Sequence, residues 1–148
     1  MLVEEYLGGR EFTVSIIKSG NGEINISAIE LVLPASSGML KILGATAKKL
    51  DTEILKEIET DEIDLVKKVA ASSFQGLGAR GFGRIDVKMD NQGLCYFMEA
   101  NLLPGMNRTT SYFPRACKIA NNMTYNQVIQ LMLGESFDRV LAKKMAFK

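Results

Sequence analysis

The sequence predicts an α+β fold in which an antiparallel sheet packs against helices. Two pairs of strand-like segments, 12–17 with 24–33 and 83–89 with 95–101, are each joined by a short turn that contains glycine. Because successive strands joined by short turns pair antiparallel, both pairs are expected to be hairpins. Apolar residues at helical spacing follow each pair, which favours this class over a doubly wound parallel sheet.

The first hairpin rests on residue types. Segment 12–17 (FTVSII) is rich in β-branched and aromatic residues, and the turn 19–22 (SGNG) separates it from its partner 24–33. Residues 34–38 (PASSG) break the strand pattern. The mixed stretch 39–50 is expected to be a loop.

A helix is expected over residues 61–74, whose apolar side chains recur at helical spacing. Thr60 or Asp61 would cap its start, and Gly76 would lie just beyond its end. The glycines that follow match G-x-G-x-x-G, the dinucleotide-binding pattern. That pattern requires a strand before the glycines and a helix after them, whereas here the order is reversed, so we reject it.

The C-terminal part is expected to be a loop followed by two helices. Thr124 and Gln127 have the spacing of a capping box and precede a run of apolar residues, so a helix is expected to begin there. Gly134 is expected to interrupt it, and residues 135–147 are expected to form a final helix.

Composition excludes several classes of function. The chain has 148 residues, no histidine, and 18 basic against 17 acidic residues, for a net charge of +1. A histidine-based triad, a histidine general base and a histidine-ligated zinc are therefore excluded within it. Without a basic surplus or a long apolar stretch, neither nucleic acid nor a membrane is expected as a partner. Two cysteines and no recognisable signal peptide lead us to expect a reduced, cytoplasmic protein.

Four polar residues in the second hairpin require an explanation. Arg84 and Asp86 share one face of their strand, and Glu99 and Asn101 share one face of the next, together with Cys95 and Phe97. If Asp90 lies opposite Gly93 across the turn, Asp86 faces Phe97 and Arg84 faces Glu99, so all four polar groups converge. A slip of one residue would separate them.

Two carboxylates and an amide oxygen form an oxygen-only donor set. Such a set suits Mg²⁺ or Mn²⁺ held by few protein ligands and completed by substrate phosphates. Arg84 could bind a phosphoryl oxygen and steady developing negative charge. A Gly105 N–H directed at the same pocket would be an anion donor, and Ser111 follows in the same loop. The spacing is equally compatible with a solvated sheet face that carries an Arg84–Glu99 ion pair.

The stretch GRIDVKMDNQGLCYFMEANLLPGM, followed by SYFP, resembles the C-terminal part of D-alanine–D-alanine ligases, which belong to the ATP-grasp superfamily. VEEYLGGREFTV resembles the adenine- and ribose-binding hinge of that family, and ILGATAKKLD faintly resembles its phosphate-closing loop. The resemblance implies that the chain is the C-terminal half of an ATP-grasp domain, a single partial domain over residues 1–148. The first-substrate domain and the lobe with the glycine-rich phosphate loop would be absent.

The resemblance also implies roles for individual residues. Asp86, Glu99 and Asn101 match the ligands that hold Mg²⁺ against ATP, and Arg84 and the Gly105 N–H match groups that stabilise the tetrahedral intermediate. Ser111 matches the residue that receives the carboxylate of the second amino acid, in a loop one residue longer than usual. The adenine- and ribose-binding residues and the loop lysine of the family fall on Glu4, Glu5, Tyr6, Leu7, Glu11 and Lys48.

The implied activity is ATP-dependent ligation of two D-amino acids through an acyl phosphate, a step in peptidoglycan precursor synthesis. As half of such an enzyme, the chain is expected to be inactive alone, and its exposed sheet is expected to favour a homodimer or a missing N-terminal half as partner. Segment 34–51 lacks the aromatic-rich closing loop of the family, so D-lactate or another D-amino acid remains open as second substrate. Another ATP-grasp ligase, or a non-catalytic remnant that binds nucleotide or dimerises, also remains open.

Overall fold

The computed structural model describes residues 3, 5–20, 22–32 and 53–146. The elements in these ranges are β1 (Glu11–Lys18), β2 (Ile24–Val32), β3 (Ile54–Glu57), α2 (Glu62–Gly76), β4 (Phe82–Met89), β5 (Cys95–Asn101), α3 (Tyr112–Asn121) and α4 (Tyr125–Ala146). Both predicted hairpins and the first predicted helix are confirmed. The expected loop at 39–50 lies outside the described residues.

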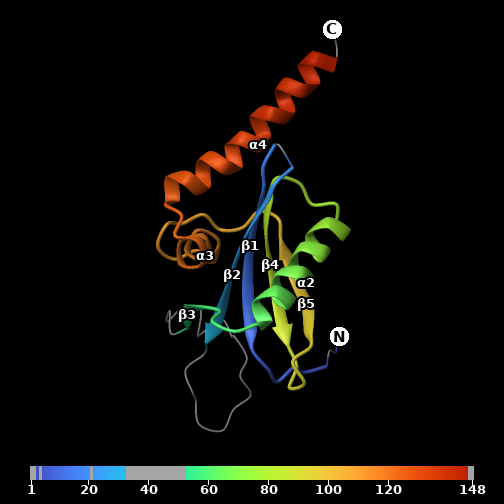
Figure 1. Ribbon diagram of the computed structural model, residues 1–148, viewed down its shortest axis with the longest axis vertical. Coiled ribbons are helices and arrows are strands. Elements are labelled where there is room, and N and C mark those ends of the chain that lie inside the picture. Colours follow the sequence, from blue (N-terminus) through green and yellow to red (C-terminus); the bar gives the residue numbers. More distant parts are fainter. Residues whose placement is uncertain (1–2, 4, 21, 33–52, 147–148) are drawn as a thin grey trace.

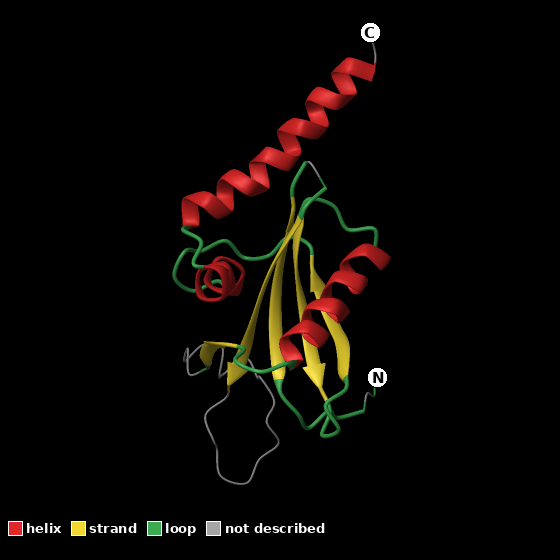
Figure 2. Cartoon of the chain, in the orientation of Figure 1, coloured by secondary structure: helices red, strands yellow, loops and turns green. Residues whose placement is uncertain are grey.

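The strands form one antiparallel sheet in the order β3-β2-β1-β4-β5. Helix α2 packs on one face, against β4, β5, β1 and β2, whereas α3 packs against β1, β2 and β3 (Figure 1). Helix α4 contacts α3 and β1 and then extends away from the sheet, past the tip of the β1–β2 hairpin (Figure 2). The sheet is therefore the middle layer, as the α+β prediction requires.

Alternation along the strands sorts apolar side chains into two clusters, one on each side of the sheet. The cluster beneath α2 comprises Phe12, Val14, Ile16, Ala28, Ile58, Val66, Ala70, Phe74, Ile85, Val87 and Met89. The cluster that α3 and α4 complete comprises Ile17, Phe113, Cys117, Val128 and Met132. The second cluster is smaller because polar side chains alternate with the apolar ones along β1 and β4 and occupy much of that face.

Two elements were missing from the sequence prediction. Helix α3 lies where a loop was expected, and the short strand β3 was not anticipated. Pro114 is the third residue of α3, where it is tolerated because the first backbone N–H groups of a helix have no partner within the helix. Ser111 before the helix and the left-handed Asn122 after it (φ 50°) are the signals that could have identified α3.

The expected helix boundaries need correction. Helix α2 includes Gly76, and the turn that ends it centres on Gly78 (φ +64°). The N–H groups of Gly78 and Ala79 donate to the carbonyls of Gln75 and Phe74 at 2.9 and 3.1 Å, the pattern of a Schellman motif. Asp61 precedes the helix, but its side chain makes no capping hydrogen bond.

Helix α4 is continuous, so the prediction that Gly134 divides it into two helices is wrong. Its predicted start is confirmed. The backbone N–H of Gln127 donates to the Thr124 hydroxyl at 3.3 Å, and the Thr124 N–H donates to the Gln127 side-chain oxygen at 2.8 Å. No helix in the described ranges has both the length and the apolar character that crossing a bilayer requires.

Candidate active site: a polar face on the sheet

One face of the sheet carries a row of polar side chains from three adjacent strands. We call it the polar face; its members are Glu11, Thr13, Ser15, Arg84, Asp86, Lys88, Glu99 and Asn101. It lies on the α3 side, because the Ser15 hydroxyl donates to the Phe113 carbonyl at 3.0 Å. The alternate residues of β1 and β4 fill the cluster beneath α2. Two-residue periodicity therefore gives the chain an apolar face for packing and a polar face for chemistry.

The predicted register of the second hairpin is wrong, although its four polar groups do converge. Asp86 lies opposite Glu99, and Arg84 lies opposite Asn101, two residues further along β5 than expected. Part of the shift arises at the turn. Asp90 pairs with Leu94 rather than Gly93, and Gly93 (φ +85°) provides the left-handed residue of a three-residue loop.

A β-bulge accounts for the rest of the shift. Val87 pairs with Phe97 and Asp86 with Glu99, so Met98 is an extra residue in β5. The extra residue reverses the alternation of side chains along the strand. Phe97 and Cys95 consequently lie opposite Val87 and Met89, on the face that packs against α2. The expectation that they share a face with Glu99 is therefore wrong.

Arg84 is the centre of the converged cluster. Its Nε and Nη2 donate to Asp86 Oδ1 and Oδ2 at 2.9 and 2.7 Å, and Nη2 also donates to Glu99 Oε1 at 3.3 Å. Asn101 Nδ2 donates to the same Glu99 oxygen at 2.8 Å, and the Thr13 hydroxyl donates to Asp86 Oδ1 at 2.6 Å. All four residues predicted around the metal site are thus in one hydrogen-bonded group.

Burial differs sharply across this cluster. The side chains of Arg84 and Asp86 are 14% and 18% exposed, whereas that of Glu99 is 59% exposed. Burial raises the pKa of Asp86 above its ordinary value and Glu99 adds to the rise, against the opposing hydrogen bonds from Arg84 and Thr13. A cation that arrives from solvent would meet Glu99 first and Asp86 behind it.

The donor set fits a hard divalent cation with few protein ligands. Two carboxylates face each other and an amide adjoins them, while no group of three or more acidic or cysteine side chains suited to a metal occurs in the described part of the chain. Mg²⁺ and Mn²⁺ are commonly held by one or two carboxylates, with water and phosphate oxygens completing the shell.

Gly105 and Ser111 lie together in the loop that follows β5. A methyl group at position 105 would come within 2.8 Å of Ser111 Oγ. That hydroxyl accepts a hydrogen bond from the Asn107 N–H at 2.9 Å, and it does not cap α3. The loop is therefore folded back on itself, with the two predicted residues in contact.

Tyr112 connects this loop to Arg84. The Arg84 guanidinium carbon lies 5.4 Å from the centre of the Tyr112 ring, and the Tyr112 hydroxyl donates to Glu53 Oε1 at 2.6 Å. Burial, followed by the hydrogen bond to Glu53, raises the pKa of Tyr112 far above its ordinary value. Tyr112 is therefore a protonated donor at any physiological pH.

The residues predicted for adenine and ribose lie at the far end of the polar face. Glu11 accepts a hydrogen bond from Lys88 Nζ at 3.0 Å, beside a hollow of about 210 Å³ that both residues line together with Gly8 and Gly9. Among the predicted hinge residues, Glu5 and Tyr6 are exposed and Leu7 is partly buried. Glu4 and Lys48 lie outside the described residues.

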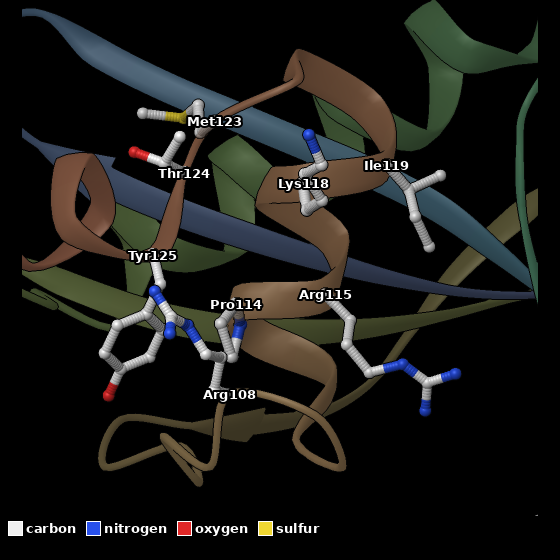
Figure 3. A pocket seen from close by; sticks show the side chains of 8 residues that line it. All are labelled: Arg108, Pro114, Arg115, Lys118, Ile119, Met123, Thr124 and Tyr125. Carbon is white, nitrogen blue, oxygen red and sulfur yellow. The ribbon is translucent and has the colours of Figure 1, made fainter.

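A larger hollow, of about 400 Å³, lies elsewhere, between α3, the start of α4 and the loop before α3 (Figure 3). Its lining includes Arg108, Arg115 and Tyr125 but no member of the polar face. Arg108 lies over the Tyr125 ring at 5.2 Å, while Arg115 points away from that pair. Because its cations do not converge, this hollow does not resemble a phosphate site.

Sequence reasoning assigned no role to Thr13, Lys88 and Tyr112, which contact predicted residues, although Lys88 was expected on the same face as Arg84 and Asp86. Glu53, which also had no predicted role, contacts Tyr112. Thr13 and Lys88 could have been included in the predicted site. Each lies among the polar residues of a strand that alternate with apolar ones, and alternate residues share a face. Glu53 and Tyr112 carried no such signal, since the strand and the helix beside them were not predicted.

The family model and the curated relatives that match this chain all belong to one family. The family model described as "D-ala D-ala ligase C-terminus" matches residues 1–134. A D-alanine–D-alanine ligase of Pelotomaculum thermopropionicum is 37% identical over 121 residues, which cover 80% of this chain and 36% of that protein. One from Thermotoga petrophila is 30% identical over 137 residues, covering 93% of this chain and 44% of that protein.

Solved structures agree on the fold. The D-alanine–D-alanine ligase of Bacillus anthracis, crystallised with ATP, superimposes with a TM-score of 0.71 at 24% identity over 95% of this chain and 42% of that one. The VanG D-Ala:D-Ser ligase of Enterococcus faecalis gives a TM-score of 0.66 at 22% identity over 88% and 37%. The fold is thus that of the ATP-grasp ligases, and the chain spans about two-fifths of the length of the relatives it matches. The chain belongs to the D-alanine–D-alanine ligase family and corresponds to the C-terminal part of those enzymes.

Proposed function

We propose that this chain is the C-terminal lobe of an ATP-dependent carboxylate–amine ligase and carries its metal- and phosphate-binding face. The observation that carries this proposal is the convergence of Arg84, Asp86, Glu99 and Asn101 on one face of the sheet. Family membership supplies the reaction class. Two carboxylates and an amide beside an arginine are the groups that suit metal-assisted phosphoryl transfer, which supports the proposal.

Each residue has a role within this proposal. Asp86, Glu99 and the Asn101 amide would hold Mg²⁺ or Mn²⁺, which when bound neutralises charge on the transferred phosphoryl group. Arg84 binds a phosphoryl oxygen and offsets negative charge that develops at the reacting carboxylate. Gly105 donates its N–H to the same developing charge, and Ser111 orients the carboxylate of the incoming amino acid.

Glu11 and the hinge residues Glu5 to Leu7 would hold the ribose and base of ATP, beside the hollow that Glu11 and Lys88 share. A carboxylate that accepts two ribose hydroxyls would have to exchange one hydrogen bond with Lys88 for them. This placement puts the base at one end of the polar face and the metal at its middle, the order in which a nucleotide presents its base and phosphates.

The substrates we propose are two D-amino acids, with D-alanine as the first choice and a D-hydroxy acid such as D-lactate as an alternative second substrate. The product would serve peptidoglycan precursor synthesis in the cytoplasm. The matched relatives are more than twice as long as the aligned region, so we propose that catalysis needs the remaining parts of such a ligase and that this region alone does not turn over.

Calorimetry with Mg·ATP on the purified chain tests the nucleotide site. We expect binding to the unsubstituted chain and its loss in Asp86→Ala and Glu99→Ala. Asp64→Ala, on the exposed surface of α2, is the matched control and should bind normally. Circular dichroism checks folding, because Asp86→Ala leaves Arg84 without a partly buried partner; the more exposed Glu99 gives a variant that should fold regardless.

Retained binding in both folded variants would refute the proposed site. No binding to the unsubstituted chain would refute the proposal that this lobe alone holds nucleotide. Release of ADP in the presence of D-alanine, by the chain without any companion, would refute the proposed dependence on the rest of the ligase.

A further inference from the structure

Arg84 occupies the place where the proposed cation would bind. Its Nη2 lies 2.7 Å from Asp86 Oδ2 and 3.3 Å from Glu99 Oε1, so the guanidinium bridges the two carboxylates. A divalent ion held by the same oxygens cannot share this position with a second cation. Occupation of the metal site therefore requires Arg84 to release at least one of these contacts.

Arg84 has a second partner that such a release would leave in place. The face of the Tyr112 ring lies 5.4 Å from the guanidinium carbon, within the range of a cation–π interaction. Arginine commonly combines carboxylate pairing with stacking on an aromatic ring. The ring can therefore keep the guanidinium beside the site while the carboxylates change partner.

The ring itself is fixed by a buried carboxylate. The Tyr112 hydroxyl donates to Glu53 Oε1 at 2.6 Å, and Glu53 is only 7% exposed. Within the described residues, Glu53 Oε2 is buried and has no hydrogen-bond partner. Within the described residues, Tyr112 thus supplies the hydrogen bond that this buried carboxylate accepts. A short hydrogen bond to a buried carboxylate fixes the geometry of the pair.

We propose that Tyr112, anchored by Glu53, is a positioning residue that holds Arg84 over its ring so that Asp86 and Glu99 can exchange the guanidinium for a divalent cation. The part of this inference that concerns the cation rests on the proposed function. The part that concerns Arg84 in the ligand-free chain does not, because it depends only on the contacts between Glu53, Tyr112 and Arg84.

The chain offers a matched control for a tyrosine beneath an arginine. Arg108 lies 5.2 Å from the centre of the Tyr125 ring, and the Tyr125 hydroxyl donates to the Met106 carbonyl at 3.0 Å (Figure 3). This pair lines the hollow beside α3 and has no member on the polar face. Tyr125→Leu therefore removes a stacked ring and a hydroxyl but leaves the contacts between Glu53, Tyr112 and Arg84 in place.

The first measurement follows the Arg84 Nε–H signal by ¹⁵N NMR. We expect Tyr112→Leu to remove the ring-current displacement of this signal, and Tyr112→Phe and Glu53→Gln to broaden or partly shift it. Tyr125→Leu should leave it unchanged and displace the Arg108 signal instead. An Arg84 signal unaffected by Tyr112→Leu would overturn the positioning role, whatever the chain binds.

The second measurement titrates Mn²⁺ alone and follows paramagnetic broadening around Asp86 and Glu99. We expect Tyr112→Leu to weaken binding by about threefold to thirtyfold, the range of a cation–π contact, because Arg84 then stays on the carboxylates. Arg84→Gln should bind Mn²⁺ more tightly than the unsubstituted chain, since the competing cation is removed. Tyr125→Leu should bind like the unsubstituted chain.

A double variant tests whether Tyr112 acts through Arg84. In the Arg84→Gln background, Tyr112→Leu should have no further effect on Mn²⁺ affinity. If Tyr112→Leu lowered Mn²⁺ affinity equally with and without Arg84, Tyr112 would merely support the fold. That result would overturn the proposal that Tyr112 acts by positioning Arg84. Absence of Mn²⁺ broadening in the unsubstituted chain would overturn both the proposed metal site and the exchange of the Arg84 guanidinium for a cation. The Arg84 Nε–H signal would still decide whether Tyr112 positions Arg84.

Discussion

At the scale of single residues, Arg84 combines the two interpretations that its spacing allowed. The ion pair to Glu99 expected of a solvated sheet face is present at 3.3 Å, alongside the predicted cluster with Asp86 and Asn101. Burial distinguishes the two interpretations, because Arg84 and Asp86 are mostly withdrawn from solvent and Thr13 supports Asp86 from β1. A solvated ion pair has no need of such support.

A second arginine–carboxylate pair lies on the opposite side of the sheet and is structural. Arg10 Nε and Nη2 donate to the two oxygens of Glu30 at 2.9 and 2.8 Å, and the Glu30 side chain is only 9% exposed. The hydrogen bond from Arg10 is the main cause that holds the pKa of Glu30 below its ordinary value of 4.5. The pair joins the segment before β1 to β2.

Glu30→Gln should reveal this pair through the pH dependence of unfolding. Because folding lowers the pKa of Glu30, its contribution to the free energy of unfolding is complete above about 4.5 and is lost as pH falls through the folded pKa. We expect the variant to be less stable at pH 7 by about 1–3 kcal/mol, with the difference shrinking below pH 4.5. Urea unfolding from pH 3 to 7 measures this. A constant difference across that range would contradict the assignment.

At the scale of elements, what could be predicted depended on whether the signal was periodic. Strands β1, β2 and β4 and helix α2 each carry an apolar repeat of two or of about three and a half residues, and all were predicted. Strand β5 was predicted as the hairpin partner of β4. Strand β3 has only four residues, and α3 has ten with a proline in its first turn, so neither contains enough periods to stand out.

The bulge in β5 could not be predicted for a different reason. Residue types at Phe97 and Met98 are equally compatible with regular alternation and with an inserted residue, since both are large and apolar. Only pairing with β4 decides between them. The four polar groups still converged because the turn and the bulge each shifted the register by one residue, and two shifts restore the original face for Glu99 and Asn101.

Two glycines allow a matched test of helix continuation against helix termination. An added Cβ would have no neighbour within 4 Å at either Gly134, inside α4, or Gly78, beyond α2, so packing does not distinguish them. Backbone conformation does, because Gly78 has a φ of +64° and Gly134 is helical. We expect Gly134→Ala to raise the free energy of unfolding by about 0.5–1 kcal/mol and Gly78→Ala to lower it by about 1 kcal/mol.

Thermal and urea unfolding of both variants measure these differences. A loss of stability in Gly134→Ala would mean that α4 is interrupted at that residue, as the sequence alone suggested. An unchanged Gly78→Ala would mean that α2 does not end in the left-handed turn seen at that position.

At the scale of the whole molecule, the sheet separates stability from chemistry. The face beneath α2 holds the larger apolar cluster, and the opposite face combines a smaller cluster under α3 and α4 with the polar face. This division follows from strand periodicity, so the layout of the site could be predicted even where its register could not. The anchoring of Arg84 by Tyr112 and Glu53 could not, because strand β3, which follows Glu53, and helix α3, which begins at Tyr112, were not predicted.

The edge strand β5 leads to a prediction about self-association. It ends the sheet beside β4, and several large apolar side chains on it or beside it are exposed, including Met98 at 52% and Leu103 at 91%. An edge with such side chains and no lysine or proline within the strand is a surface that proteins usually cover. The bulge at Met98 disturbs the ladder and opposes simple strand addition, so we expect side-chain contacts to dominate.

We therefore expect the purified chain to form dimers as its concentration rises, and the double variant Met98→Lys with Leu103→Lys to remain monomeric. Each lysine would carry charge into the contact, which a desolvated apolar surface disfavours. Sedimentation velocity over a concentration series measures the change, with Leu133→Lys on the exposed surface of α4 as the control that should still dimerise. If Leu133→Lys abolished association and the double variant did not, the contact would lie on α4. If the unsubstituted chain stayed monomeric throughout, the exposed β5 edge would not be a self-association surface.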